Sequence, residues 1–141
     1  MVDLALAFDF AKTRHQGVLV TQKRDGRPQL SNVAYALTDG VVRVSVTADR
    51  AKTANLRRDP RASLYVGRDD FWAYAVLEGD AELSAVTAAP DDATAEELVV
   101  LYRTVRGEDH PDWAEFRRAM VQERRLVVRL RVTHAYGMTG R

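Results

Sequence analysis

Alternating apolar and polar residues dominate the first half of the chain. In VVRVSVT, residues 41–47, valine occupies positions 42, 44 and 46, and polar residues lie between them. Because successive side chains of a strand point to opposite faces, this pattern predicts a strand with one apolar and one polar face. By the same criterion, strands are predicted over 17–24, 29–37, 41–47, 61–67 and 71–84.

Other segments repeat their apolar residues every three or four positions, as amphipathic helices do. Helices are therefore predicted over 3–14, within 89–107 and within 110–122. Gly107 follows the second of them as a typical helix stop. Alternation returns at 125–132, which predicts a further strand that residues 134–138 either continue or pair with.

Short connections decide how the early strands pair. Asp25-Gly26 and Asp39-Gly40 are typical of hairpin turns, so their flanking strands are expected to be antiparallel. Such connections are too short for the crossovers of a doubly wound parallel sheet. Six or seven antiparallel strands are expected to close into a barrel, which would remove the exposed edges. The sequence predicts a mainly β protein with several helices, in a single domain over 1–141.

Composition narrows the possible function classes. The 141 residues are 46% hydrophobic and 29% charged, as in ordinary soluble domains, and a net charge of +1 gives no general attraction to nucleic acid or membrane. The absence of cysteine excludes disulfides and thiolate catalysis and fits a cytoplasmic protein. The three histidines are far apart, so no metal site is expected. Asp3 and Asp9 interrupt the first apolar stretch, which therefore does not resemble a signal peptide.

A basic segment, DRAKTANLRRDPRA at residues 49–62, forms a short predicted helix. Asp49 is expected to cap it, and residues 50–58 have the composition to coil. Pro60 restricts the residue before it and is expected to end the helix.

The first turn of this helix carries two cations, Arg50 and Lys52. Cations are unfavourable at a helix N-terminus because the helix dipole is positive there. A bound phosphate would accept hydrogen bonds from the free backbone N–H groups and from both cations. Ser45, on the preceding strand, could add a hydroxyl. The alternative is a solvated basic face, and the residues alone leave the two interpretations open.

Several acidic and aromatic side chains also allow both a structural and a functional interpretation. Asp91, Asp92, Glu96 and Glu97 lie at the start of a predicted helix, where the dipole favours acids, so we interpret them as structural. The stripe Trp113, Phe116 and Met120 is interpreted as core. Trp72 and Tyr74 share a face of the strand at 71–84, and either a site or interface role or a plain core role is open for them.

Several segments, in order along almost the whole chain, resemble a known family. They are DGRPQLSNV, RAKTANLRRDPRAS, WAYAVLEG, APDD, LYRTVRGE, FRRAMVQERR and HAYG. They resemble the deazaflavin-dependent branch of the pyridoxamine 5'-phosphate oxidase-like proteins of actinobacteria. The resemblance implies an FMN-binding-type split β-barrel that forms a homodimer.

The resemblance also implies a cofactor in a groove between the two subunits. The phosphate of the cofactor is expected at Ser45, Arg50 and Lys52. Gln29, Ser31 and Asn32 match positions near the ring system and the ribityl chain. Trp72, Tyr74 and Arg125 match positions that approach the cofactor in the dimer, expected from the other subunit. No residue is assigned a catalytic role, although Tyr74 is a candidate for orienting the acceptor.

Coenzyme F420 is the expected cofactor, with FMN as the alternative. Coenzyme F420 is a deazaflavin with a phospholactyl oligoglutamate tail, and its extra negative charge suits additional basic residues. Candidates for the tail are Lys23, Arg24, Arg27, Arg57 and Arg58. The implied activity is a cytoplasmic oxidoreductase that passes a hydride to a small organic acceptor. An FMN-dependent oxidoreductase and a carrier or sensor without turnover are the alternatives.

Overall fold

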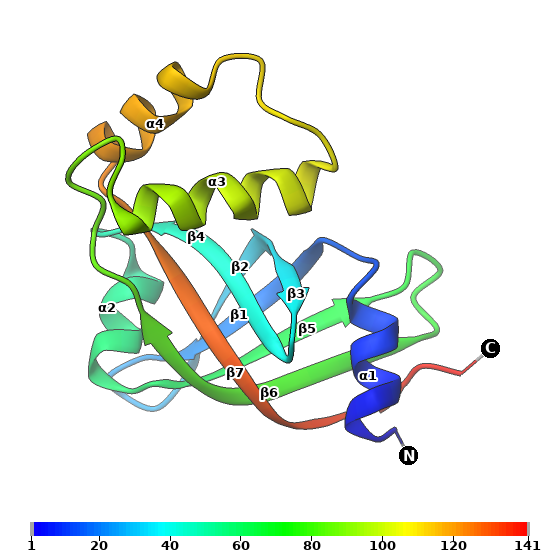
Figure 1. Ribbon diagram of the computed structural model, residues 1–141. Coiled ribbons are helices and arrows are strands. Elements are labelled where there is room, and N and C mark those ends of the chain that lie inside the picture. Colours follow the sequence, from blue (N-terminus) through cyan, green and yellow to red (C-terminus); the bar gives the residue numbers. More distant parts are fainter. Residues whose placement is uncertain (1, 141) are drawn as a thin grey trace.

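The computed structural model describes residues 2–140, which fold into a curled antiparallel sheet with four helices (Figure 1). The helices are α1 Leu4–Ala11, α2 Ala51–Arg58, α3 Ala93–Arg106 and α4 Trp113–Gln122. The strands are β1 Gln16–Gln22, β2 Pro28–Ala34, β3 Ala36–Thr38, β4 Val41–Thr47, β5 Arg61–Gly67, β6 Tyr74–Leu83 and β7 Arg125–Met138. No helix within 2–140 has the length and apolarity needed to cross a bilayer.

The seven strands follow the order β2-β1-β5-β6-β7-β4-β3, and every pair is antiparallel. The β1–β2 hairpin turns at Asp25-Gly26, as predicted. The expected closure of the sheet is wrong in one respect, because β2 and β3 remain as edges. Only Tyr35 separates these two strands in sequence, so the sheet curls until its ends meet at this residue and forms a half-barrel.

The core lies on the concave side of the sheet. In β4, Val42, Val44 and Val46 are at most 1% exposed, which confirms the predicted apolar face of this strand. Tyr35 is fully buried, and its hydroxyl donates a hydrogen bond to the Ala11 carbonyl at 2.7 Å, so α1 packs over one end of the half-barrel. Burial raises the pKa of Tyr35, which keeps the hydroxyl protonated as a donor.

Most predicted elements are found, with shifted ends. Helix α1 ends at Ala11 rather than at residue 14, because the chain must extend by His15, whose carbonyl accepts a hydrogen bond from Tyr35 N. Helix α3 begins after Asp92 and ends at Gly107, which has φ +70°, as the glycine stop predicts. The last strand, β7, is continuous over Arg125–Met138, so residues 134–138 continue it.

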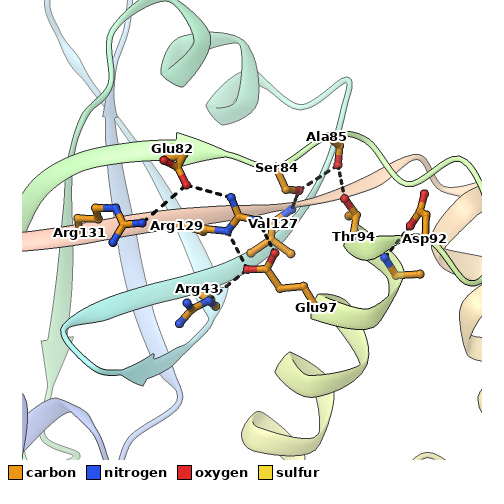
Figure 2. A network of polar contacts seen from close by, with 11 residues as sticks. Arg43, Glu82, Ser84, Ala85, Asp92, Thr94, Glu97, Val127, Arg129 and Arg131 are labelled. Atoms are coloured by element: carbon orange, nitrogen blue, oxygen red, sulfur yellow. Dashed lines mark hydrogen bonds and ion pairs between the residues drawn. The ribbon is translucent and has the colours of Figure 1, made fainter.

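Charged hydrogen bonds attach α3 to the sheet (Figure 2). Glu97 of α3 accepts hydrogen bonds from Arg129 Nε at 2.8 Å and from Arg43 Nε at 3.2 Å. Arg129 also donates to Glu82 at 3.0 Å. The Glu97 side chain is 19% exposed, and its hydrogen bonds from Arg129 hold the pKa of Glu97 below its ordinary value. This network fixes the distance of α3 from β4 and β7.

Glu97→Gln is expected to lower the free energy of unfolding at pH 7 by about 1–2 kcal/mol, since hydrogen bonds between charged groups contribute more than neutral ones. The pKa of Glu97 is lower in the folded than in the unfolded chain. The stabilisation is therefore present at neutral pH and is lost as pH falls through the folded-state pKa. Urea unfolding at pH 7 and pH 3 measures both effects.

Glu108→Gln is the matched control, because Glu108 is exposed and has no ion pair within 2–140. Its free energy of unfolding should change little at either pH. An equal loss for Glu97→Gln at both pH values would contradict the role of its charge.

Candidate functional site

Helix α2 starts without a capping side chain. Its N-cap residue is Arg50, and no side chain accepts a hydrogen bond from the first turn. The prediction that Asp49 caps this helix is wrong, because its carboxylate accepts a hydrogen bond from Thr47 Oγ1 at 2.8 Å. Thr53 Oγ1 donates to the Thr47 carbonyl at 2.8 Å and ties the helix start to the end of β4. The first-turn N–H groups therefore lack a side-chain acceptor.

Four polar side chains gather at this helix start. Arg125, at the beginning of β7, donates a hydrogen bond to Ser45 Oγ at 3.3 Å. Lys52 is only 7% exposed, and it has no hydrogen-bond or ion-pair partner in the described chain. Burial lowers the pKa of Lys52, and the positive charges of Arg50 and Arg125 lower it further. Arg125 also pairs with Glu123 at 2.9 Å, whereas Arg50 and Lys52 have no ion pair in the described chain. This surplus of positive charge suits an anion such as phosphate.

These residues form one end of a cleft of about 420 Å³, here called the first cleft. Ser45, Val46 and Thr47 of β4 form one wall, and Asn32–Ala34 at the edge of β2 form another. Apolar side chains of α3 and α4 complete it, and these are Leu98, Leu101, Tyr102, Val105, Phe116 and Met120. The first cleft is thus apolar along most of its length and cationic at the end where β4 leads into α2 (Figure 1).

Incomplete closure of the sheet gives the first cleft a polar backbone lining. Strand β3 pairs only with Val41–Arg43 of β4, so residues 44–47 have no strand partner on that side. Strand β2 likewise has no strand partner on the side away from β1. Both strands therefore present backbone N–H and C=O groups that a flat heterocycle can hydrogen-bond.

Five of the nine predicted site residues lie together in the first cleft, namely Asn32, Ser45, Arg50, Lys52 and Arg125. Arg125 meets Ser45 of the same chain, whereas the resemblance led us to expect it from the other subunit. No local sequence pattern indicates that Arg125 contacts Ser45, because the two residues are 80 positions apart.

Gln29 and Ser31 point instead to the interior side of the hairpin. Thr21 Oγ1 donates to Gln29 Oε1 at 3.1 Å, and Gln29 Nε2 donates to Ser31 Oγ at 3.1 Å. Asn55 Nδ2 of α2 donates to the buried Thr21 Oγ1 at 3.1 Å. Within one chain, these residues brace α2 against the β1–β2 hairpin and do not line the first cleft.

Trp72 and Tyr74 do not share a strand face. Strand β6 starts at Tyr74, so Trp72 lies in the preceding turn and is 77% exposed. Phe71 in the same turn has φ +75° and is 79% exposed. Tyr74 stacks against Tyr65 of β5, with 5.7 Å between ring centroids. Neither Trp72 nor Tyr74 lines the first cleft of its own chain.

The stripe on α4 is not core, contrary to prediction. No residue of α4 is buried. Phe116 and Met120 line the first cleft, while Trp113 packs edge-on against Phe116 and Tyr102 at 5.4 and 5.6 Å. An amphipathic stripe has the same pattern whether it covers a core or a cleft, so its periodicity does not distinguish the two.

The structural interpretation of the acidic group is confirmed for three of its members. Asp92 accepts hydrogen bonds from the backbone N–H of Ala95 and Ala88, both at 2.8 Å. Glu96 pairs with Arg117 at 2.7 Å, and Glu97 belongs to the network described above.

The five tail candidates also differ from one another. Arg58 donates to the Gln22 carbonyl at 2.7 Å and to Asn55 Oδ1 at 3.0 Å, so it is tied to the fold. Arg58 is exposed like the other four, but for Lys23, Arg24, Arg27 and Arg57 no side-chain hydrogen bond or ion pair is found within residues 2–140.

The curled seven-stranded antiparallel sheet with four helices is a split-barrel fold, as predicted. A sequence model described as pyridoxamine 5'-phosphate oxidase matches residues 6–139, and the chain therefore belongs to this family. It is also similar to a conserved hypothetical protein from Mycobacterium tuberculosis, with 25% identity and a TM-score of 0.77 over 99% of this chain and 86% of that one.

Two further solved structures share the fold. An F420 reductase has 24% identity and a TM-score of 0.65, over 92% of this chain and 94% of that one. A heme-binding protein from Mycobacterium smegmatis has 24% identity and a TM-score of 0.69, over 96% of this chain and 53% of that one. One fold thus occurs in proteins described by different ligands, so the choice of cofactor must be argued from the site.

Lys52→Met is expected to raise the melting temperature of the ligand-free protein. The substitution removes a buried unpaired cation and keeps the aliphatic bulk. Because the pKa of Lys52 is lowered in the folded chain, its charge opposes folding at neutral pH, and this cost is relieved only as pH rises into the alkaline range. Inorganic phosphate should raise the melting temperature of the wild type by a few degrees and that of Lys52→Met much less.

Thermal unfolding with and without millimolar phosphate tests both expectations. Arg57→Met is the matched control, because Arg57 is an exposed cation on the same helix. Equal phosphate responses of the wild type and Lys52→Met would exclude Lys52 from the anion site.

Proposed function

We propose that this protein binds coenzyme F420 in the first cleft and transfers a hydride between the cofactor and a small organic acceptor. The observation that carries the proposal is the cluster of Arg50, Lys52 and Arg125 with the Ser45 hydroxyl, at the end of a cleft with apolar walls. Such a site matches a molecule with a flat ring system at one end and a phosphate at the other.

The deazaflavin ring, when bound, supplies the hydride chemistry. The residues of the chain then bind, orient and exclude water. The cations hold the phosphate, which sets the direction of the cofactor along the first cleft. The apolar residues Leu101 and Val105 of α3 restrict water access, and the unpaired backbone of β2 and β4 is available to the polar edge of the ring. An acid/base pair is not needed for these roles.

Several observations favour coenzyme F420 over FMN. The motif resemblance is to the deazaflavin-dependent branch, and one structure with the same fold is an F420 reductase. Lys23, Arg24, Arg27 and Arg57 are exposed cations without carboxylate partners within 2–140, so they are available to an oligoglutamate tail. FMN remains the second candidate, because proteins of the pyridoxamine 5'-phosphate oxidase family typically bind a flavin.

We also propose that the protein acts as a homodimer. The convex side of the sheet carries an apolar surface, the outer apolar face, which comprises Val18, Val20, Leu30, Tyr65, Tyr74, Val76, Tyr136 and Met138. These residues share one face because Val18, Tyr65, Val76 and Tyr136 are successive cross-strand partners. Leu30 is 59% exposed and Met138 is 64% exposed. A second copy is the occupant that fits a self-complementary surface of this kind.

The cofactor proposal is tested by titrating the apo protein with coenzyme F420 and with FMN, following fluorescence. Coenzyme F420 is expected to bind more tightly. Lys52→Ala should weaken its binding by roughly 10- to 150-fold, because a hydrogen bond to a charged group contributes about 1.5–3 kcal/mol. Arg118→Ala, an exposed arginine outside the first cleft, should leave the affinity within about twofold of the wild type.

Stoichiometric FMN with weak F420 binding would reverse the choice of cofactor. Oxidation of the reduced cofactor by a panel of quinones, enones and tetrapyrroles distinguishes an enzyme from a carrier. Tight F420 binding without turnover of any acceptor would support the carrier alternative.

The dimer proposal is tested by light scattering, which should give about twice the chain mass of 15.8 kDa. Met138→Glu places a charge on the outer apolar face and is expected to shift the protein toward the monomer. Val100→Glu is the control, because Val100 is 59% exposed but lies on α3, away from this face. A monomeric wild type that binds coenzyme F420 with full affinity would contradict a site shared by two subunits.

A further inference from the structure

A second cleft, of about 1030 Å³, adjoins the first. The two clefts share the wall formed by Asn32–Ala34 of β2 and by Val105 and Arg106 at the end of α3. A phosphate held at the start of α2 lies at the far end of the first cleft. A cofactor anchored there therefore extends from its phosphate toward the shared wall, beyond which the second cleft opens.

The charge of the second cleft is mainly positive. Arg14, Arg68 and Arg106 line it, and Asp69 is the one carboxylate in its lining within residues 2–140. Arg68 pairs with Asp70 at 2.9 Å, which leaves two arginines to consider.

Arg14 and Arg106 lack carboxylate partners in the described chain. Arg14 donates to the Phe10 carbonyl at 2.5 Å, and its guanidinium lies over the Phe10 ring at 3.9 Å. The Arg106 guanidinium lies 5.5 Å from the centroid of the Tyr102 ring. Ring contacts orient both guanidinium groups and satisfy few of their donors, so donors remain for an anionic ligand.

The rest of the lining is partly apolar or aromatic and partly polar, with His15, Gln16 and Asn32 as its polar side chains. Val18, Tyr65 and Phe71 line the second cleft, and Phe71 is 79% exposed. Val18 and Tyr65 also belong to the outer apolar face, so in the proposed dimer this side of the second cleft borders the partner subunit. A ligand for this cleft combines an apolar body with at least one carboxylate.

We propose that the second cleft binds the hydride acceptor and that this acceptor is an apolar organic acid whose carboxylate is held by Arg14 and Arg106. The acceptor role rests on the proposed function, whereas anion binding does not. In the transfer, a C–H bond of the reduced coenzyme F420 would break, and the cofactor would be oxidised by two electrons. The hydride would form a new C–H bond at one carbon of a conjugated double bond of the acceptor, and the electron pair of the broken π bond would take one proton from water at the open mouth of the second cleft, so that the acceptor is reduced by two electrons.

The binding test uses cofactor-free wild-type protein and two fluorescent probes, 1-pyrenebutyrate and the uncharged 1-pyrenebutanol. The butyrate should bind at least tenfold more tightly than the alcohol. Arg106→Gln alters an exposed side chain, and with Arg14→Gln it should weaken butyrate binding at least tenfold while leaving alcohol binding within twofold. Arg118→Gln, outside both clefts, should change neither.

Equal affinities of the two probes, or an unchanged affinity in the double variant, would overturn the proposal. So would loss of butyrate binding in Lys52→Ala, because the probe would then occupy the first cleft. Circular dichroism of each variant checks the fold, and Arg106→Gln alone decides the outcome if Arg14→Gln unfolds the protein.

The acceptor role has its own readout. With reduced coenzyme F420, apolar enones that carry a carboxylate should be reduced with a KM at least tenfold below that of their methyl esters, and Arg106→Gln should remove this difference with little change in kcat. Equal KM values would overturn the acceptor role. If coenzyme F420 does not bind at all while butyrate binding still depends on the arginines, the proposed function fails and the anion site stands.

Discussion

The site depends on one constraint, which is that two strands adjacent in sequence occupy opposite edges of the sheet. Only Tyr35 separates β2 from β3, so the sheet must curl until its two ends meet there. Strand β3 is too short to pair with the whole of β4, and the ends do not join by a ladder. Exposed edges are usually a liability because they pair with other chains. Here α3 and α4 lie beside the open stretch (Figure 1), and their side chains line the first cleft together with those of β2 and β4.

Charged side chains are paired on the α3 side of this cleft, whereas Lys52 on the α2 side is not. At α3, Glu97 pairs with Arg129 and Arg43, so each charge is compensated and the helix has a fixed position. At α2, Lys52 is buried beside Arg50 and Arg125 and has no ion pair of its own in the described chain, while Arg125 pairs with Glu123. An uncompensated cation lowers stability, whereas the paired network supports the wall opposite it. An anion that binds at α2 restores the missing compensation, so the cost of the site in the free protein becomes affinity in the complex.

The sequence was sufficient to predict local structure and to single out the cationic start of α2. Alternation in β4 and the glycine stop of α3 are local signals, and both were correct. Arg50 and Lys52 were found because cations oppose the dipole at a helix start, a rule that needs no tertiary contact. Arg125 was reached only by resemblance, since its position beside Ser45 depends on the pairing of β4 with β7. The apolar stripe of α4 was misinterpreted because periodicity does not reveal what a helix covers.

Membership of the split-barrel family identifies the fold of this chain but not its ligand. Proteins of this fold are described by ligands as different as heme and coenzyme F420, so the fold alone does not identify the ligand of this chain. In this chain the cations at α2 lie at one end of the first cleft, and the edge of β2 is a wall common to both clefts. Under the proposed function, a cofactor in the first cleft and an acceptor in the second would lie on either side of this strand edge and would meet without a conformational change. Hydrogen bonds from Asn55 of α2 to Thr21, and from Thr21 to Gln29 of β2, brace this strand against the helix. A braced strand edge holds its position more rigidly than a loop would, and transfer between two bound molecules requires such a fixed geometry.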